Sequence, residues 1–392
     1  MNSYLSERAL KIKPSATVAA NDKAKKLKQQ GADIINLTAG QPDFHTPDFI
    51  KQAAIDAIHA NHTGYTPVDG CPEIKSAILA KLKRDNNLTY QDNQIIVSCG
   101  VKQVLFNLTQ ATLGPGDEAI VLAPYWVSYP AMVSLAGATP VTITAGIDQQ
   151  FKITPEQLEA SISERTKMLF INSPSNPCGS AYTLNELKAL GEVLEKYPNI
   201  LIASDDIYEY ILWGQEHFFN IVNACPKLYD RTIVMNGVAK AHCMTGWRIG
   251  FAACHPDLMK AMKKIQSQST TCATSIAQHA AAKAFLATKE DFFQPMLTAY
   301  KERHDYIVAA LNDIDGISAI PSEGTFYTFF DATGLIERLN LQDDLELTDY
   351  LLEKANVALV PGSAFGCKNH MRLSFATSMD VLKQAIDRIK AL

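Results

Sequence analysis

The feature that most constrains the fold is a repeated alternation between short apolar runs and longer stretches of helical periodicity. Apolar runs of strand length stand at 94–98, 118–123, 168–171, 200–203, 232–235 and 249–254. Helical periodicity marks residues 101–113 and 184–197, and Thr183 with Glu186 forms the pattern of a capped helix start. Strand, helix and strand in series predict a mostly parallel sheet with helices on both faces.

The domain organisation follows from a change of pattern in the second half of the chain. A long helical pattern runs from about 274 to 311, and the pattern after Ile317 is typical of an α+β unit. A chain of 392 residues suggests two or three units, at ~150 residues each. We therefore expect a large α/β domain over residues 45–295. Residues 1–44, which include an N-terminal arm, would join residues 296–392 in a smaller α+β domain.

Composition and targeting signals narrow the class of protein. A net charge of -5 gives no electrostatic reason to expect nucleic acid or an anionic membrane as a partner. Apolar runs are far shorter than the ~20 residues of a membrane-spanning helix, and the N-terminus has no apolar core of a secretory signal. The eight cysteines are scattered singly, without metal or redox spacing. We expect a cytoplasmic protein without a bound metal.

Polar and aromatic residues follow five of the apolar runs. Ligands of open α/β sheets bind at the carboxyl ends of strands, so these turns are candidates for a site. They are 98–102, 123–129, 172–177, 204–208 and 236–248. Taken singly, most of them also fit ordinary roles such as a glycine turn, packed aromatics, an Asx turn or a helix cap. Lys240 fits a solvated surface charge poorly, because its neighbours are small and apolar.

Together the five turns supply what pyridoxal phosphate needs. A lysine such as Lys240 can bind its aldehyde, and an aspartate such as Asp205 can keep its ring nitrogen protonated. A helix start after Gly100, with Lys102, suits a phosphate. Trp126 can cover the face of a flat ring. A phenol, an amide and an arginine in these turns complete the set.

The run NGVAKAHCMTGWRIGF around Lys240 closely resembles the lysine motif of fold-type I, class I aminotransferases. The segments KPSAT, LTAGQPDF, TGYTPVDG, GPGDE, PYWVSYP, NSPSNPCG, SDDIYE, GTFY and MRLSFATS follow in family order. The nearest group is similar to the bacterial aspartate aminotransferases. The resemblance implies the α/β PLP-transferase fold of type I, pyridoxal 5′-phosphate as cofactor, amino-acid and 2-oxo-acid substrates, and a homodimer with shared active sites.

The resemblance also implies catalytic roles. Lys240 would anchor the cofactor covalently and move the proton of the substrate Cα. Asp205 would pair with the ring nitrogen, and Asp206 would be its non-catalytic neighbour. Tyr208 and Asn176 would bind the ring hydroxyl.

Binding roles follow in the same way. The phosphate would be held by Gly100, Val101, Lys102 and Arg248, joined by Tyr65 from a second subunit. The ring would stack on Trp126. The substrate would lie against Gly40, Trp126, Asn176 and Arg372, and Arg372 would grip its α-carboxylate through a bidentate contact.

Two departures from the family pattern bear on these roles. Relatives often carry a hydroxyl residue at the positions of Ala239 or Gly237. The phosphate would then depend more on Arg248 and the helix start. Some aspartate-specific members have a lysine for the distal carboxylate where this chain has Gln110.

The leading hypothesis is therefore transfer of the amino group of L-aspartate to 2-oxoglutarate. Aromatic amino acids, prephenate, glutamine or kynurenine are alternative substrates on the same fold, and β-elimination by a C–S lyase is an alternative reaction. A regulator built on this domain would need a DNA-binding domain ahead of it, and we expect none. The first strand–helix turn has no GxGxxG, which argues against an NAD-binding Rossmann protein.

Overall fold

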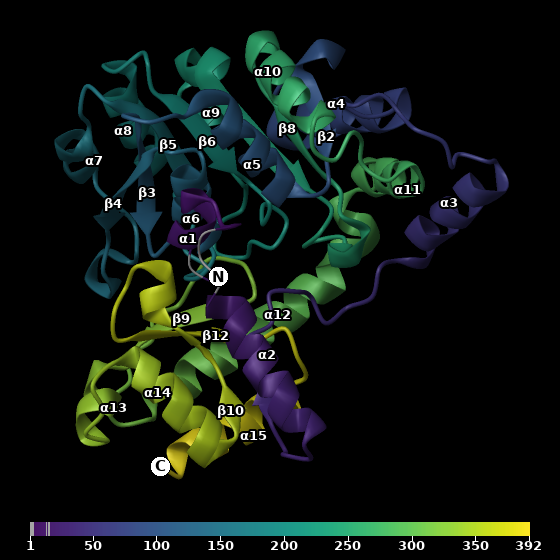
Figure 1. Ribbon diagram of the computed structural model, residues 1–392. Coiled ribbons are helices and arrows are strands. Elements are labelled where there is room, and N and C mark those ends of the chain that lie inside the picture. Colours follow the sequence, from purple (N-terminus) through teal and green to yellow (C-terminus); the bar gives the residue numbers. More distant parts are fainter. Residues whose placement is uncertain (1–3, 13, 15) are drawn as a thin grey trace.

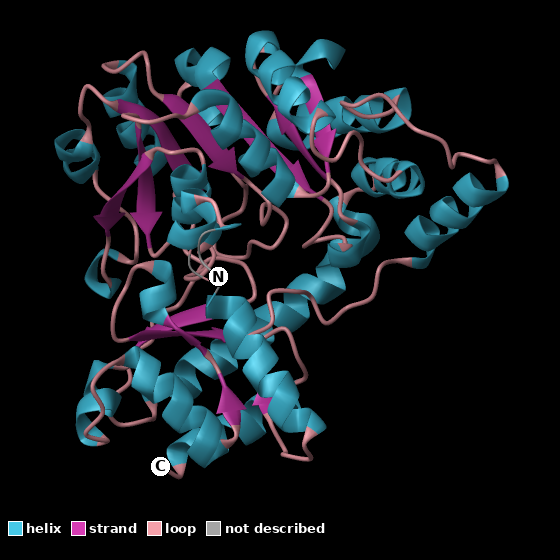
Figure 2. Cartoon of the chain, viewed as in Figure 1, coloured by secondary structure: helices cyan, strands magenta, loops and turns pink. Residues whose placement is uncertain are grey.

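The computed structural model describes residues 4–12, 14 and 16–392, without the side chains of residues 11, 16, 17 and 289–292. Lys13 and Ser15 of the KPSAT segment lie outside the described residues. Figures 1 and 2 show an upper part with a large sheet between helices and a lower part with smaller sheets. The helix α12 (Lys289–Asn312) runs from one part to the other (Figure 1).

The large sheet has seven strands in the order β2-β8-β7-β6-β5-β3-β4. Their bounds are β2 Ile95–Ser98, β3 Glu118–Ala123, β4 Thr139–Thr144, β5 Thr166–Asn172, β6 Leu201–Asp205, β7 Thr232–Gly237 and β8 Gly250–Ala253. Only β8 runs against its neighbours, so the expected, mostly parallel sheet is confirmed. The edge strand β4 was not predicted, because it is largely exposed, contains Pro140 and so has no apolar run.

Helices cover both faces of this sheet. They are α4 Pro72–Asn86, α5 Val101–Thr112, α6 Ser128–Leu135, α7 Pro155–Ser161, α8 Leu184–Glu195, α9 Ile221–Ala224, α10 Pro256–Ser267 and α11 Ser275–Leu286. Helix α3, Asp48–His59, packs on α11 at the side of the molecule (Figure 1). The expected capped start of α8 is confirmed. Thr183 Oγ1 accepts from Glu186 N at 3.3 Å, and Glu186 Oε2 accepts from Thr183 N at 2.7 Å.

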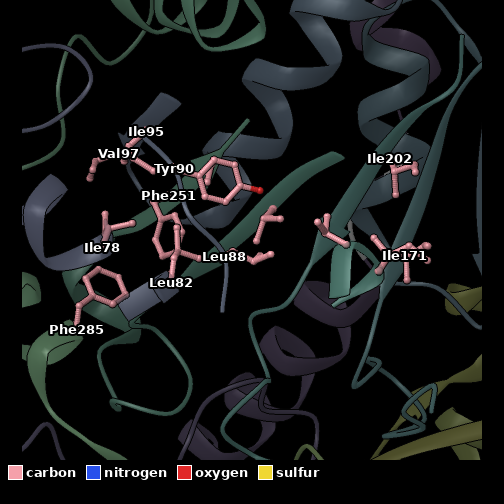
Figure 3. Close-up of a cluster of buried hydrophobic side chains, with 14 of the residues drawn as sticks. Ile78, Leu82, Leu88, Tyr90, Ile95, Val97, Ile171, Ile202, Phe251 and Phe285 are labelled. Carbon is pink, nitrogen blue, oxygen red and sulfur yellow. The ribbon is translucent and has the colours of Figure 1, made fainter. Parts of the chain in front are cut away.

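Alternate residues of the strands pack on opposite faces of the sheet. Ile95 and Val97 join an apolar cluster with α4, α8 and α11, part of which Figure 3 shows. Ile96, between them, packs on the other face with α5, α6 and α10. Burying both faces of the sheet explains why its central strands read as continuous apolar runs.

The lower part contains two small sheets. In one, β9 (Tyr327–Asp331), β11 (Val360–Pro361) and β12 (His370–Ser374) are antiparallel. In the other, β1 (Ile35–Asn36) pairs in parallel with β10 (Val357–Ala358). The remaining helices are α1 Glu7–Lys11, α2 Ala16–Gln29, α13 Thr333–Arg338, α14 Asp344–Tyr350 and α15 Met379–Lys390. The domain boundaries at 44/45 and 295/296 stay a prediction, which this placement of the sheets supports.

The long helical pattern at 274–311 is divided in the structure. Helix α11 ends before Ala287, which is extended, and α12 begins at Lys289. Arg84 donates to the carbonyl oxygens of Phe285, Leu286 and Ala287 and so caps the end of α11. Thr288 followed by acidic residues is a helix-start pattern within the continuous periodicity.

None of the helices described is long and apolar enough to cross a membrane.

Candidate active site

The topology brings the five expected turns to one edge of the large sheet. β2, β3, β5, β6 and β7 all point the same way, so the turns after them meet. β8 runs the opposite way, so Arg248, just before it, lies at the same edge. A cavity of about 490 Å³ opens there. The position fits the rule that open α/β sheets bind ligands at this edge.

Most of the expected site residues line this one cavity. They are Gly40, Gly100, Val101, Lys102, Trp126, Asn176, Asp205, Tyr208, Lys240, Arg248 and Arg372. Tyr65 does not line it, since its side chain is 94% exposed on the segment between α3 and α4. The roles of these residues stay predictions.

Lys240 follows β7 and directs its amine into the cavity. Its Nζ donates to the carbonyl oxygen of Gly40 at 2.5 Å. Burial lowers the pKa of Lys240 to about 8, helped by the positive charges of Arg372 and Arg248. A lysine with this pKa is partly neutral near pH 7, as a nucleophilic amine must be.

Asp205 is the last residue of β6 and is buried. Its Oδ2 accepts a hydrogen bond from the hydroxyl of Tyr129 at 2.7 Å. Burial raises the pKa of Asp205 to about 6, so the group is mainly ionised at pH 7. Asp206 has other partners: it accepts from Ser204 Oγ at 2.7 Å and from Asn220 Nδ2. The two adjacent carboxylates therefore lie in different surroundings. Asp205 lines the cavity, and Asp206 is hydrogen-bonded to side chains outside it.

One end of the cavity has the properties of an anion site. Helix α5 begins at Val101, and the first N–H groups of a helix have no acceptors within it. Gly100 has a φ of 86°, and a Cβ there would lie 2.5 Å from a guanidinium nitrogen of Arg248. Lys102 lies with its Nζ 4.8 Å from the ring centroid of Trp126. Cations, free N–H groups and an aromatic ring thus meet at this end.

A buried arginine stands at another side of the cavity. Arg372 of β12 donates to Asn176 Oδ1 at 3.0 Å and to the carbonyl oxygen of Thr38 at 2.8 Å. Its guanidinium carbon lies 4.4 Å from the ring centroid of Tyr327. Its Nε is buried and has no hydrogen-bond partner within the described part of the chain. Arg372 pairs with no carboxylate there, and a buried cation in that state favours an anionic ligand.

Polar contacts hold the floor of the cavity in place. Asn172 Nδ2 donates to the carbonyl oxygen of Asp205 at 2.8 Å, and its Oδ1 accepts from Asn176 N at 2.9 Å. The hydroxyls of Tyr208 and Tyr327 lie 3.2 Å apart. These contacts link the turns after β5 and β6 to β9.

Several residues of the cavity were missed from the sequence. Tyr129 lies one helical turn after Trp126, which is a signal that could have found it. Asn21 and Lys25 of α2, Thr38 and Tyr327 also line the cavity. Thr38 and Tyr327 lie within the quoted segments LTAGQPDF and GTFY, whereas Asn21 and Lys25 belong to no quoted segment. Gln110 lies outside the cavity lining; its Nε2 is buried without a partner among the described residues.

Comparisons with known proteins agree with this geometry. Residues 32–389 match the family model "Aminotransferase class I and II". The chain is 53% identical to an aspartate/prephenate aminotransferase of Nitrosomonas europaea, over 99% of either chain. It is 46% identical to an aspartate aminotransferase of Bacillus subtilis, over 98% of either chain. An aspartate aminotransferase structure from Thermus thermophilus with maleate has a TM-score of 0.92 and 40% identity, and covers 99% of both chains.

Proposed function

Since the chain belongs to the class I and II aminotransferases, we propose that it binds pyridoxal 5′-phosphate on Lys240 and transfers the amino group of L-aspartate to 2-oxoglutarate. The enzyme class, a transaminase, follows from the family. One observation supports the choice of cofactor and of Lys240 as its anchor: a lysine of lowered pKa lines the same cavity as a buried aspartate and an anion site.

The residues present fit this cofactor. Its phosphate matches the anion site of Gly100, Lys102 and Arg248, where a Cβ at position 100 would meet the guanidinium. Its ring nitrogen matches Asp205, whose carboxylate accepts from one side chain among the described residues, that of Tyr129. When bound, pyridoxal phosphate supplies an aldehyde for amines and a conjugated ring that withdraws electrons from the substrate Cα.

The chain's own groups then carry out the remaining work. Asp205, ionised at pH 7, holds a proton at the ring nitrogen. Lys240, once displaced by the substrate amine, takes the proton from Cα as a general base and later returns one as a general acid. Its lowered pKa of about 8 suits both directions. Tyr208 and Asn176 orient the ring through its hydroxyl.

The substrate is a dicarboxylate in this proposal. Arg372 binds the α-carboxylate, and its buried Nε keeps a donor available. Lys25 of α2 is a further cation on the cavity wall and would meet the distal carboxylate. The Thermus thermophilus aminotransferase, similar over its whole length, was solved with the dicarboxylate maleate, which supports this class of ligand.

Prephenate is a second candidate substrate, because the Nitrosomonas europaea relative is named an aspartate/prephenate aminotransferase. Prephenate is also a dicarboxylate 2-oxo acid, so the same two cations would serve it. Consumption of prephenate with L-aspartate as donor tests this. Release of pyruvate and sulfide from cysteine-type substrates without an acceptor would instead indicate a C–S lyase.

We further propose a homodimer in which Tyr65 completes the phosphate site of the other subunit. Its 94% exposed side chain is free to do so. Helix α3, just before it, exposes Phe49, Ile55 and Ile58 by 45–49%, which fits a covered surface. Light scattering should give twice the chain mass. We also propose a cytoplasmic location, in keeping with eight free cysteines.

The first experiment is an absorbance spectrum of the purified protein, before and after addition of L-aspartate without acceptor. If a visible cofactor band is present and L-aspartate shifts it, the result supports pyridoxal phosphate as cofactor, Lys240 as its anchor and L-aspartate as amino donor. A band that does not change on addition of L-aspartate would contradict L-aspartate as the amino donor but would still support the cofactor. No band, even after addition of pyridoxal phosphate, would contradict the role of Lys240.

A further inference from the structure

A cysteine, a glutamate and a histidine meet outside the active-site cavity, where α4 and α11 pack together. One ligand atom from each of Cys71, Glu73 and His279 lies within 4.8 Å of the other two. Cys71 precedes α4, Glu73 lies in its first turn, and His279 is on α11. The exposed His62, just after α3, stacks on His279 with ring centroids 4.1 Å apart. Sulfur, oxygen and nitrogen ligand atoms thus meet from two segments, and the ring of His62 lies beside them.

The backbone around Cys71 is held independently of any ligand. Gln278 Oε1 accepts from Cys71 N at 2.8 Å, and Gln278 Nε2 donates to Thr66 Oγ1 at 2.9 Å and to the carbonyl oxygen of Ala273 at 2.8 Å. The buried Gln278 therefore fixes the start of α4 to α11, next to His279. Such support from neighbouring residues is what keeps metal ligands in position.

We propose that Cys71, Glu73 and His279, with His62 as fourth ligand, bind a divalent transition-metal ion of the zinc class. Zinc takes four Cys, His and carboxylate ligands in tetrahedral geometry, which places ligand atoms roughly 3.5 Å apart. The side chains of Glu73 and His62 are exposed and can rotate, which would bring their ligand atoms to the shorter separation of a tetrahedral site. The α3–α4 segment would then be fastened to α11.

The charges balance in such a site. Metal binding displaces the thiol proton of Cys71 to solvent and forms the metal–sulfur bond. One thiolate and one carboxylate neutralise the doubly charged ion, while both imidazoles bind as neutral rings. The start of α4 adds a favourable dipole for the thiolate.

The test is zinc binding by the holoenzyme, measured by metal analysis after dialysis and by calorimetric titration. The wild type should retain one zinc per chain. Cys71→Ser and His279→Gln should each weaken binding at least about tenfold, the lower bound for losing even an outer partner of a metal site. Cobalt in place of zinc should give the visible bands of a tetrahedral thiolate site, and these should disappear in Cys71→Ser.

Cys225→Ser is the matched control. Cys225 is also buried, and it also precedes a proline at a helix start. This variant should bind zinc as the wild type does. Failure of the wild type to retain zinc, or equal binding by Cys71→Ser and His279→Gln, would overturn the proposal. His279 is only half-buried, so its variant keeps the test valid if Cys71→Ser folds poorly.

Discussion

The segment from Asp205 to Tyr210 supplies polar side chains to two neighbouring regions that treat charge differently. Asp205 and Tyr208 face the cavity of Lys240. Glu209 and Tyr210 face a buried group that we call the Lys81 cluster, formed by Lys81, Asp85, Asn86, Glu209 and Tyr210. Lys81 pairs there with Glu209 and donates to Asn86 Oδ1 at 2.6 Å. Asn86 Nδ2 in turn donates to Glu209 Oε2 at 2.8 Å.

In the Lys81 cluster the charged groups have partners of opposite charge: Lys81 pairs with Glu209, and the neighbouring Arg84 pairs with Asp85. The cations of the cavity have no such partner among the described residues. Lys240 rests on a carbonyl oxygen, and Arg372 has a buried Nε without a partner among the described residues. A buried charge without its counter-ion lowers stability and is retained where a ligand will complete it. Cavity substitutions should therefore cost activity, and cluster substitutions should cost stability.

The largest effect is expected from Lys240→Ala. Turnover should fall by at least about 10²–10⁴-fold, the usual contribution of a general acid–base group. The midpoint of thermal unfolding should not fall, because a buried cation of lowered pKa is removed. Steady-state kinetics measures the turnover, and calorimetry measures the midpoint of thermal unfolding. Activity like the wild type would refute the mechanism.

Lys81→Met should show the reverse behaviour. The free energy of unfolding should fall by about 3–5 kcal/mol, because Glu209 keeps a buried charge without its partner. Turnover of the folded enzyme should stay close to that of the wild type. Lys83→Met, on the exposed side of the same helix, is the control for denaturant unfolding. A cluster variant that loses turnover at unchanged stability would break the comparison.

The pH dependence of cofactor capture sharpens the comparison within the cavity. Only the neutral amine of Lys240 attacks an aldehyde, and its pKa of about 8 lies below the ordinary lysine value. The rate at which the apoprotein takes up pyridoxal phosphate should rise with pH up to about 8 and then level off. Below pH 8 it should fall by about tenfold per unit. Stopped-flow absorbance measures this rate, and a plateau reached only above pH 10 would contradict the lowered pKa.

Tyr129→Phe should have a smaller effect. It removes the hydrogen bond that lowers the pKa of Asp205, so this pKa should rise further above its ordinary value. Turnover should fall by about tenfold, equivalent to ~1.4 kcal/mol. The acid limb of the pH profile should move to higher pH. Tyr125→Phe, outside the cavity lining, is the control and should leave the profile unchanged.

The smallest effect is expected from Lys25→Ala. The preference of kcat/KM for L-aspartate over L-alanine should fall by about two- to fivefold, the range for an exposed ion pair. Lys26→Ala, next in sequence and not part of the cavity lining, should leave the preference unchanged. An unchanged ratio in Lys25→Ala would remove this residue from substrate recognition.

Sequence alone predicted the elements whose signals are local. The strand at 118–123 was predicted with the bounds of β3, because it is apolar from Ala119 on and lies between a glycine turn and Pro124. The break between α11 and α12 escaped although Thr288 offers a helix-start signal. The helical periodicity continues across the break, and the cap of α11 is Arg84, some two hundred residues earlier. Lys25 escaped for the same reason, because only the fold brings it to the cavity. Thr38 lies within the segment LTAGQPDF, but its contact with Arg372 depends on the fold. Strand ends and family motifs located the other residues of the site.

The bond from Arg372 to the carbonyl oxygen of Thr38 joins residues 334 positions apart, and β1 pairs with β10 across a similar span. During synthesis at ~5–20 residues per second, the early segment waits tens of seconds for these partners. The sheet between β2 and β8 can form on the ribosome, but its cavity lacks the arginine until β12 has emerged. A nascent or truncated chain should therefore be able to take up cofactor before it can hold an amino acid. The final step of maturation is then the docking of the last strands, not the folding of the large sheet.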